Sequence, residues 1–202
     1  MRHFTSLFVV MLLIVLMSAC TTAQPTESQP IESQTTESAA ESGEHEGHTM
    51  PENADIPFDA TFIDGMIAHH QGAIEMAEQA VKNAEHEEVH TLAQEIIATQ
   101  TTEIEQLQSW RAEWFAGLAR TEGMAMDMGA MSVSTDESTS YDQRFLEAMI
   151  SHHEGAIEMA EMALEMSDHQ EIRSLAEDII TTQSSEIEQM RGWLSEWYNV
   201  SE

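Results

Sequence analysis

Residues 62–78 read Phe62-Ile-Asp-Gly-Met-Ile-Ala-His-His-Gln-Gly-Ala-Ile-Glu-Met-Ala-Glu78, and residues 145–161 read Phe145-Leu-Glu-Ala-Met-Ile-Ser-His-His-Glu-Gly-Ala-Ile-Glu-Met-Ala-Glu161. These stretches belong to two longer segments, residues 59–114 and 142–197, which align without a gap at an offset of 83. Because 29 of the 56 aligned positions are identical, we interpret the segments as two copies of one structural unit. A solenoid usually needs three or more repeats, so two copies favour a single domain with internal symmetry.

The first part of each copy has a helical pattern. In the first copy Phe62, Met66, His69, His70 and Ala73 recur at steps of three and four residues, and there is no alternation that would indicate a strand. On a helical projection both histidines fall on the same stripe as the apolar residues. We therefore expect both histidines of each pair to face the interior.

The second part of the first copy predicts another helix, from Glu87 to about Leu118. Its apolar residues share one face, and Glu103 falls within that face rather than opposite it. We predict a turn at residues 83–86 between the two helices, and an equivalent turn at residues 167–170 in the second copy. Asp59 and Asp142 lie near the start of each copy, where an acidic residue fits the beginning of a helix.

Four helices paired by short turns predict an all-α fold, an antiparallel four-helix bundle made of two repeated helical hairpins. We expect hairpin 1 at residues 57–119, a Met-rich connector at residues 120–141 and hairpin 2 at residues 142–199, with residues 57–199 forming one domain. A pseudo-twofold axis would relate the two hairpins.

The beginning of the chain predicts export. Arg2 and His3 precede an apolar run at residues 7–17, which is too short to span a bilayer and is typical of a secretory signal. Residues 16–20, Leu-Met-Ser-Ala-Cys, resemble the lipobox of bacterial lipoproteins, which implies lipidation of Cys20, the only cysteine. We predict a signal peptide at residues 1–19 and a disordered acidic tether, rich in Ser, Thr and Gln, at residues 20–56. The protein would then be lipid-anchored to the cell envelope; an ordinary cleaved signal is the alternative.

The formal net charge of −30 at pH 7 restricts the partners. Nucleic acid and anionic membrane surfaces are disfavoured, whereas cations are concentrated near the protein. Strong acidity also serves solubility, so charge alone does not identify a function.

The paired histidines are candidate metal ligands, since imidazole is the commonest metal ligand in proteins. A methionine lies one helical turn before the first histidine of each pair, and a glutamate is expected from the neighbouring helix. Such soft, intermediate and hard donors suit copper, as Cu(I) or Cu(II), better than magnesium or calcium. The alternative is that one histidine of each pair packs in the core against the glutamate while the other faces the rim. The candidate ligands are His69, His70, Met66, Glu103, His152, His153, Met149 and Glu186.

Two further groups of residues are candidates for auxiliary metal binding. The connector contains Met124, Met126, Met128 and Met131, whose spacing does not follow a helical stripe, so that packing explains them poorly. Thioether sulfur favours Cu(I), although a Met-rich flexible linker is the alternative. The second group lies in the tether and consists of His45, His48 and Met50.

The pattern Asp59-x-x-Phe62-x-x-x-Met66-Ile-x-His69-His70-x-Gly72-Ala73, followed by Gln100-x-x-Glu103, occurs in both copies. It resembles the bacterial family called domain of unknown function 305 (DUF305), and the resemblance covers about residues 57–198. It implies a ferritin-like four-helix fold in secreted or membrane-anchored proteins, some of which are associated with copper binding and resistance.

Enzymatic chemistry finds little support in the sequence. Di-iron bundles use Glu-x-x-His, but here Met66 and Met149 stand three residues before His69 and His152. The sequence has no nucleophile elbow, phosphate loop or dinucleotide fingerprint. We predict a non-enzymatic copper-binding lipoprotein that buffers or sequesters the ion at the cell surface. The alternatives are a ferritin-like oxidoreductase using iron or manganese and a structural or partner-binding bundle without metal; the sequence identifies no protein partner.

Overall fold

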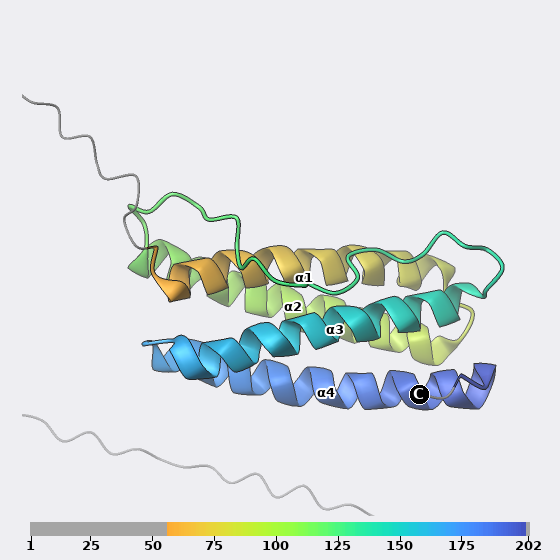
Figure 1. Ribbon diagram of the computed structural model, residues 1–202. Coiled ribbons are helices and arrows are strands. Elements are labelled where there is room, and N and C mark those ends of the chain that lie inside the picture. The colour runs from red at the N-terminus through yellow and green to blue at the C-terminus, as the bar shows by residue number, and fades with distance from the viewer. Residues whose placement is uncertain (1–55, 201–202) are drawn as a thin grey trace, which may run out of the picture. The chain divides into compact units, whose positions relative to one another are not determined.

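The computed structural model describes residues 56–200, and all regular structure in that range is helical (Figure 1). Helix α1 spans Phe58–Asn83, α2 spans Glu87–Trp114, α3 spans Tyr141–Met166 and α4 spans Gln170–Tyr198. The predicted signal peptide, Cys20 and the tether candidates His45, His48 and Met50 lie outside the described residues. None of the described helices is both long and apolar enough to span a membrane.

The helices form the two hairpins that the repeat predicted, α1 with α2 (hairpin 1) and α3 with α4 (hairpin 2). The hairpins meet where α1 packs on α3. The connector between α2 and α3 runs along α1 and α3 from one end of the bundle to the other (Figure 1). Because it spans the bundle lengthwise, α3 runs antiparallel to α1. The prediction of an all-α bundle of two hairpins is confirmed.

Helix α2 ends at Trp114, whereas the sequence predicted a helix to about Leu118. The reason is the buried side chain of Arg111, whose Nε donates to Asp64 at 2.9 Å. Its Nη2 donates to the carbonyl oxygens of Leu118 and Ala119 at 3.0 and 2.9 Å. The guanidinium thus binds the carbonyl groups of residues that follow the helix, and at this point the chain changes direction and enters the connector.

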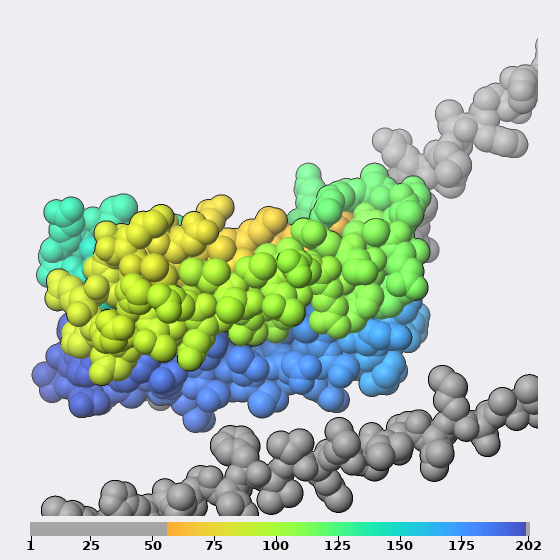
Figure 2. Space-filling view, turned by 180° about the vertical axis from the view of Figure 1, so that it is seen from behind, coloured from red at the N-terminus to blue at the C-terminus, as the bar shows by residue number. Residues whose placement is uncertain are grey.

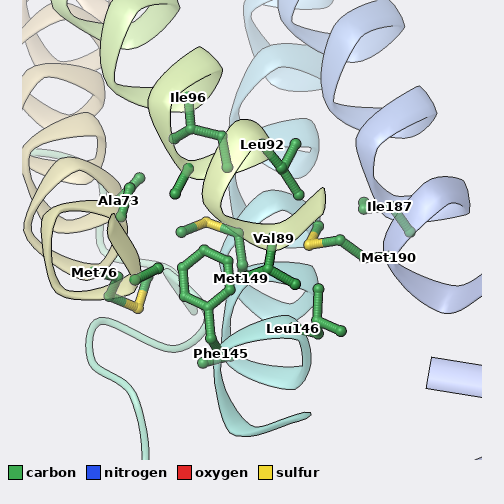
Figure 3. Packing of buried hydrophobic residues seen from close by; sticks show 14 of the residues in the cluster. Ala73, Met76, Val89, Leu92, Ile96, Phe145, Leu146, Met149, Ile187 and Met190 are labelled. Carbon is green, nitrogen blue, oxygen red and sulfur yellow. The ribbon is translucent and has the colours of Figure 1, made fainter. Parts of the chain in front are cut away.

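The apolar core consists of two clusters on either side of a polar layer. The first cluster, shown in part in Figure 3, joins the second halves of α1 and α4 to the first halves of α2 and α3. The second cluster joins the remaining halves of the four helices. Between them in every helix lies a short polar stretch, whose buried members are His69, His70, Gln100, His152, His153 and Gln183.

Each hairpin turn is held by an aspartate from the other hairpin. The Asp142 carboxylate accepts hydrogen bonds from the backbone N–H groups of Glu85 and His86 at 3.0 and 2.8 Å, and lies 2.7 Å from His86 Nδ1. At the opposite end Asp59 makes the equivalent contact with His169 Nδ1 at 2.5 Å. These aspartates therefore secure the start of the partner hairpin's second helix rather than their own helices. The paired contacts follow the expected pseudo-twofold symmetry.

Candidate metal centre

All four histidines of the repeated motif are fully buried, with 0 % exposure. The expectation that both histidines of each pair face inward is confirmed, and the alternative that one faces the rim is wrong. The motif places its two rings side by side on one helix, and α1 and α3 bring the two motifs together at the centre of the bundle.

His69 and His152 form an inner pair on the pseudo-twofold axis. Their ring centroids are 3.7 Å apart. His69 Nε2 lies 3.1 Å from the carbonyl oxygen of Met128, and His152 Nε2 lies 3.0 Å from the carbonyl oxygen of His69. A carbonyl oxygen only accepts hydrogen bonds, so each ring carries its proton on Nε2 and donates it.

Both inner histidines are held in the neutral form. Burial, and then the positive charge that His70 would carry, lower the pKa of His69 to about 3. Burial, and then the charge that His69 would carry, lower the pKa of His152 to about 2. Neutral imidazole is the form that binds metal ions, so these rings are ready for coordination at neutral pH.

His70 and His153 form an outer pair, each beside a glutamate from the second helix of its own hairpin. His153 Nε2 donates to Glu186 at 2.7 Å. His70 Nε2 and Glu103 Oε2 are also 2.7 Å apart, but they are not aligned as a hydrogen bond. The sequence correctly placed Glu103 on the inward face, where it now meets the histidine.

In all four rings Nδ1 is buried and has no hydrogen-bond partner within residues 56–200. In each ring an oxygen atom faces Nε2, which leaves the Nδ1 lone pair free. Metal-binding histidines show this arrangement, because an oxygen acceptor on one nitrogen fixes the ring and leaves the other nitrogen for the metal. Buried polar atoms without partners are uncommon, so four such nitrogens indicate that this layer binds a ligand.

The two candidate methionines of the helices are placed less favourably. Met66 is fully buried in the second apolar cluster, and Met149 is fully buried in the first. Both fill the core beside the polar layer, which is the usual role of methionine. Within the described part of the chain no three side chains of His, Cys, Asp or Glu converge to hold a metal ion. A metal ion in the polar layer would therefore have few protein ligands of these types.

The connector methionines differ among themselves. Met124, Met126 and Met128 are partly buried against the second apolar cluster, so the expectation that packing explains them poorly is wrong for these three. The physical reason is the close approach of the connector backbone to α1 and α3, which glycines permit. A Cβ atom at Gly65 would lie 3.2 Å from the backbone nitrogen of Met124.

Met131 is 43 % exposed, and its side chain lies over Gly72. A Cβ atom at Gly72 would lie 3.4 Å from Met131 Sδ and 3.4 Å from His152 Nε2. The missing side chain of Gly72 thus leaves room for a thioether beside the inner histidine pair. Of the four connector methionines, Met131 is the one whose side chain lies over Gly72, whereas Met128 reaches His69 through its backbone carbonyl oxygen.

Two buried glutamines of the polar layer had no predicted role. Gln100 and Gln183 are 2 % and 3 % exposed, and the Oε1 atom of each has no hydrogen-bond partner among the described residues. The sequence did contain a sign of this pair, because a glutamine occurs at the same position within the apolar stripe of α2 and of α4.

A family model with the description "Domain of unknown function (DUF305)" matches residues 17–111, 59–140 and 142–202. The chain belongs to this family. No protein in a search of curated proteins matches the chain.

Several solved structures are similar to this DUF305 chain. CopM in its Cu(I)-bound form is 38% identical, with a TM-score of 0.59, and the match covers 69% of this chain and 97% of CopM. CopM in its Cu(II)-bound form has the same identity and TM-score, over 69% of this chain and 98% of CopM. A putative secreted DUF305 protein from Streptomyces coelicolor is 28% identical, with a TM-score of 0.60, over 69% of this chain and 93% of that protein.

Proposed function

We propose that this protein binds copper in its central polar layer and buffers or sequesters the ion outside the cytoplasm without acting as an enzyme. The observation that carries the proposal is the set of four buried imidazoles, each with an unpartnered Nδ1 among the described residues. Four nitrogen donors of this kind suit copper and zinc better than magnesium or calcium.

Similarity to CopM supports copper as the metal. CopM has been solved in Cu(I)-bound, Cu(II)-bound and Ag-bound forms, and this chain matches nearly all of its length. Cu(I) accepts few ligands and favours soft donors, in keeping with a site that lacks three converging His, Cys, Asp or Glu side chains in residues 56–200. The secreted relative and the predicted signal peptide support a location outside the cytoplasm, where lipidated Cys20 would tether the protein.

In this proposal His69, His70, His152 and His153 supply the nitrogen ligands, with fewer than three of them around any one ion. Glu103 and Glu186 orient the outer imidazoles through Nε2, as carboxylates commonly do behind metal-bound histidines. Met131 supplies an auxiliary thioether for Cu(I), because it lies beside His152 over Gly72. Met66 and Met149, which the sequence placed among the main candidates, take a lower rank because they fill the apolar clusters. Met124, Met126, Met128 and the tether residues His45, His48 and Met50 remain auxiliary candidates.

The alternative of a ferritin-like oxidoreductase that uses iron or manganese is less well supported. A di-iron bundle needs a carboxylate one turn before each inner histidine, and Met66 and Met149 occupy those positions within the apolar clusters.

Titration with Cu(I) and Cu(II) under competition from a chelator tests the proposal. The protein would carry Cys20→Ser, so that the predicted lipid is absent. Replacing His69, His70, His152 and His153 with glutamine together is expected to weaken binding by at least a hundredfold. His90→Gln is the matched control, since the His90 ring lies outside the polar layer and hydrogen-bonds to the exposed Gln94. Unchanged stoichiometry and affinity in the fourfold variant would contradict the proposal.

A further inference from the structure

The seam between α2 and α4 contains a small cavity. Figure 2 views the face formed by these two helices, with α2 in yellow-green and α4 in blue. The cavity has a volume of about 10 Å³, which is room for about one water molecule or one ion. Its polar lining consists of equivalent residues from the two repeats, Thr99 and Thr182, Gln100 and Gln183, and Glu103 and Glu186. The cavity therefore lies on the pseudo-twofold axis.

Two uncharged side chains whose oxygen atoms can bind a cation line this cavity. The side chains of Gln100 and Gln183 are almost fully buried, and their Oε1 atoms find no hydrogen-bond donor in residues 56–200. A buried amide oxygen without a donor is unfavourable, so both atoms favour a bound water molecule or cation. Both amides are in the same position of the repeat, which points to one shared ligand.

Two carboxylates complete the lining. Oε2 of Glu103 and of Glu186 faces a histidine, so each group keeps a second oxygen atom for another partner. Among the described residues that line the cavity there is no lysine or arginine. Two carboxylates of equal charge around a water-sized space are stabilised by a divalent cation, which removes their mutual repulsion.

We propose that the seam between α2 and α4 binds one small divalent cation of the oxygen-preferring class, such as Mn²⁺ or Mg²⁺. Glu103 and Glu186 supply the charge, and the side-chain carbonyls of Gln100 and Gln183 supply neutral ligands. The seam site adjoins the proposed copper site through Glu103 and Glu186, but its ligands are hard oxygen atoms, whereas copper would use imidazole nitrogen and thioether sulfur. Occupation of the seam also fixes the carboxylates that face His70 and His153.

Mn²⁺ is the probe, since its free aqueous ion is counted directly by electron paramagnetic resonance. The double variant Gln100→Leu with Gln183→Leu removes both amide oxygens and keeps every glutamate and histidine. We expect one Mn²⁺ per wild-type protein at moderate salt, where surface binding is screened, and at least tenfold weaker binding in the variant. Equal Mn²⁺ affinity in the two proteins would place the ion elsewhere, and no Mn²⁺ binding by the wild type would show that the cavity holds only water; either result would overturn the proposal.

The matched control removes two charges from the same helices on their outer side. Glu105 and Glu188 are exposed and occupy equivalent positions of the repeat. Glu105→Gln with Glu188→Gln should leave Mn²⁺ binding unchanged, whereas Glu103→Gln with Glu186→Gln should abolish it. An equal loss in both pairs would assign the binding to general surface acidity and overturn the seam site.

Thermal unfolding separates a lost ligand from a lost fold. The leucine variant should unfold at the same or a higher temperature than the metal-free wild type, because it removes two unpartnered amides. Mn²⁺ should raise the melting temperature of the wild type but not of the variant. Cu(I) binding by the leucine variant should be unchanged, so failure of the seam site and failure of the copper proposal give different results.

Discussion

The two hairpins carry the same His-His-x-Gly motif, yet the connector covers them differently. Over Gly72 in hairpin 1 the nearest atoms belong to the Met131 side chain, whereas over Gly155 in hairpin 2 they belong to the backbone of Met128 and Gly129. A single connector cannot obey twofold symmetry, because it crosses the pair of helices only once. The difference shows that one motif has a flexible thioether cover and the other has a rigid backbone cover.

The hairpins also differ where the connector begins. In hairpin 1 the buried Asp64 receives hydrogen bonds from Arg111 at 2.9 Å and from the Thr121 backbone at 2.8 Å. The equivalent residues in hairpin 2 are Glu147, which is exposed, and Leu194, which packs in the first apolar cluster. Positions that are identical in both hairpins build the shared centre, and these differing positions direct the chain out of hairpin 1.

The largest effect on stability is expected from removing the Asp64 carboxylate, which only hairpin 1 has. Although burial alone would raise it, hydrogen bonds from Arg111 and Thr121 hold the pKa of Asp64 below its usual value. Asp64→Ala leaves the Arg111 guanidinium buried without its carboxylate, and should lower the free energy of unfolding by about 3–5 kcal/mol. Glu147→Ala, at the equivalent exposed position, should change it by less than about 0.5 kcal/mol. Urea denaturation measures both; similar losses would show that the two hairpins use this position alike.

A smaller effect on stability is expected from adding a methyl group at the two glycines that the connector covers. A Cβ atom at Gly155 would lie 2.7 Å from the backbone carbonyl carbon of Met128, whereas at Gly72 the closest atom is Cε, the far end of the Met131 side chain. Gly155→Ala should therefore destabilise the protein by about 1–3 kcal/mol, since the connector backbone must shift. Gly72→Ala should be neutral or stabilising by up to about 1 kcal/mol, because alanine favours the helix. Melting temperatures of the two variants provide the test, and equal effects would contradict the difference in cover.

A third effect concerns the centre that both hairpins share, and it is a dependence of stability on pH. His69 and His152 have folded-state pKa values far below their ordinary value of 6.5, so the unfolded chain binds more protons between that value and about 3. Their contribution is complete above pH 6.5 and is lost as the pH falls toward 3. Each imidazole adds a slope of at most about 1.4 kcal/mol per pH unit.

Urea denaturation of the metal-free protein between pH 7 and pH 4.5 measures this slope. The variant His69→Gln with His152→Gln should show a distinctly shallower dependence, since the carboxylates that titrate in the same range are unchanged. An identical dependence in both proteins would mean that the inner rings are not buried in the neutral form.

Local patterns in the sequence were sufficient for much of the fold. Steps of three and four residues located the helices and turned both histidines of each pair inward, and the inward placement of Glu103 anticipated its contact with His70. The overestimated end of α2 had a cause that local periodicity does not contain, since Arg111 acts through Asp64 on another helix and through carbonyl groups of the connector. The membrane-anchoring signal lies outside the described residues and stays a prediction.

Other contacts depend on elements far apart in the chain. The sequence placed Asp142 at the start of its own hairpin, but the residue secures the turn of the other hairpin at His86. The packing of Met124, Met126 and Met128 also escaped prediction, because the connector follows the surface of helices rather than a period of its own. The glutamines Gln100 and Gln183 became informative only when α2 and α4 were seen to enclose one cavity.

Neighbouring residues alone encode the repeated helices, the short turns and the inward face of the histidines, because helical periodicity is a local property. Contacts between distant segments set which nitrogen of each imidazole is free, which methionine side chain lies over Gly72 and where oxygen atoms of the two hairpins meet. Those features arise when segments separated by 83 residues come together, as His69 and His152 do. No local pattern encodes the distances at which such segments pack.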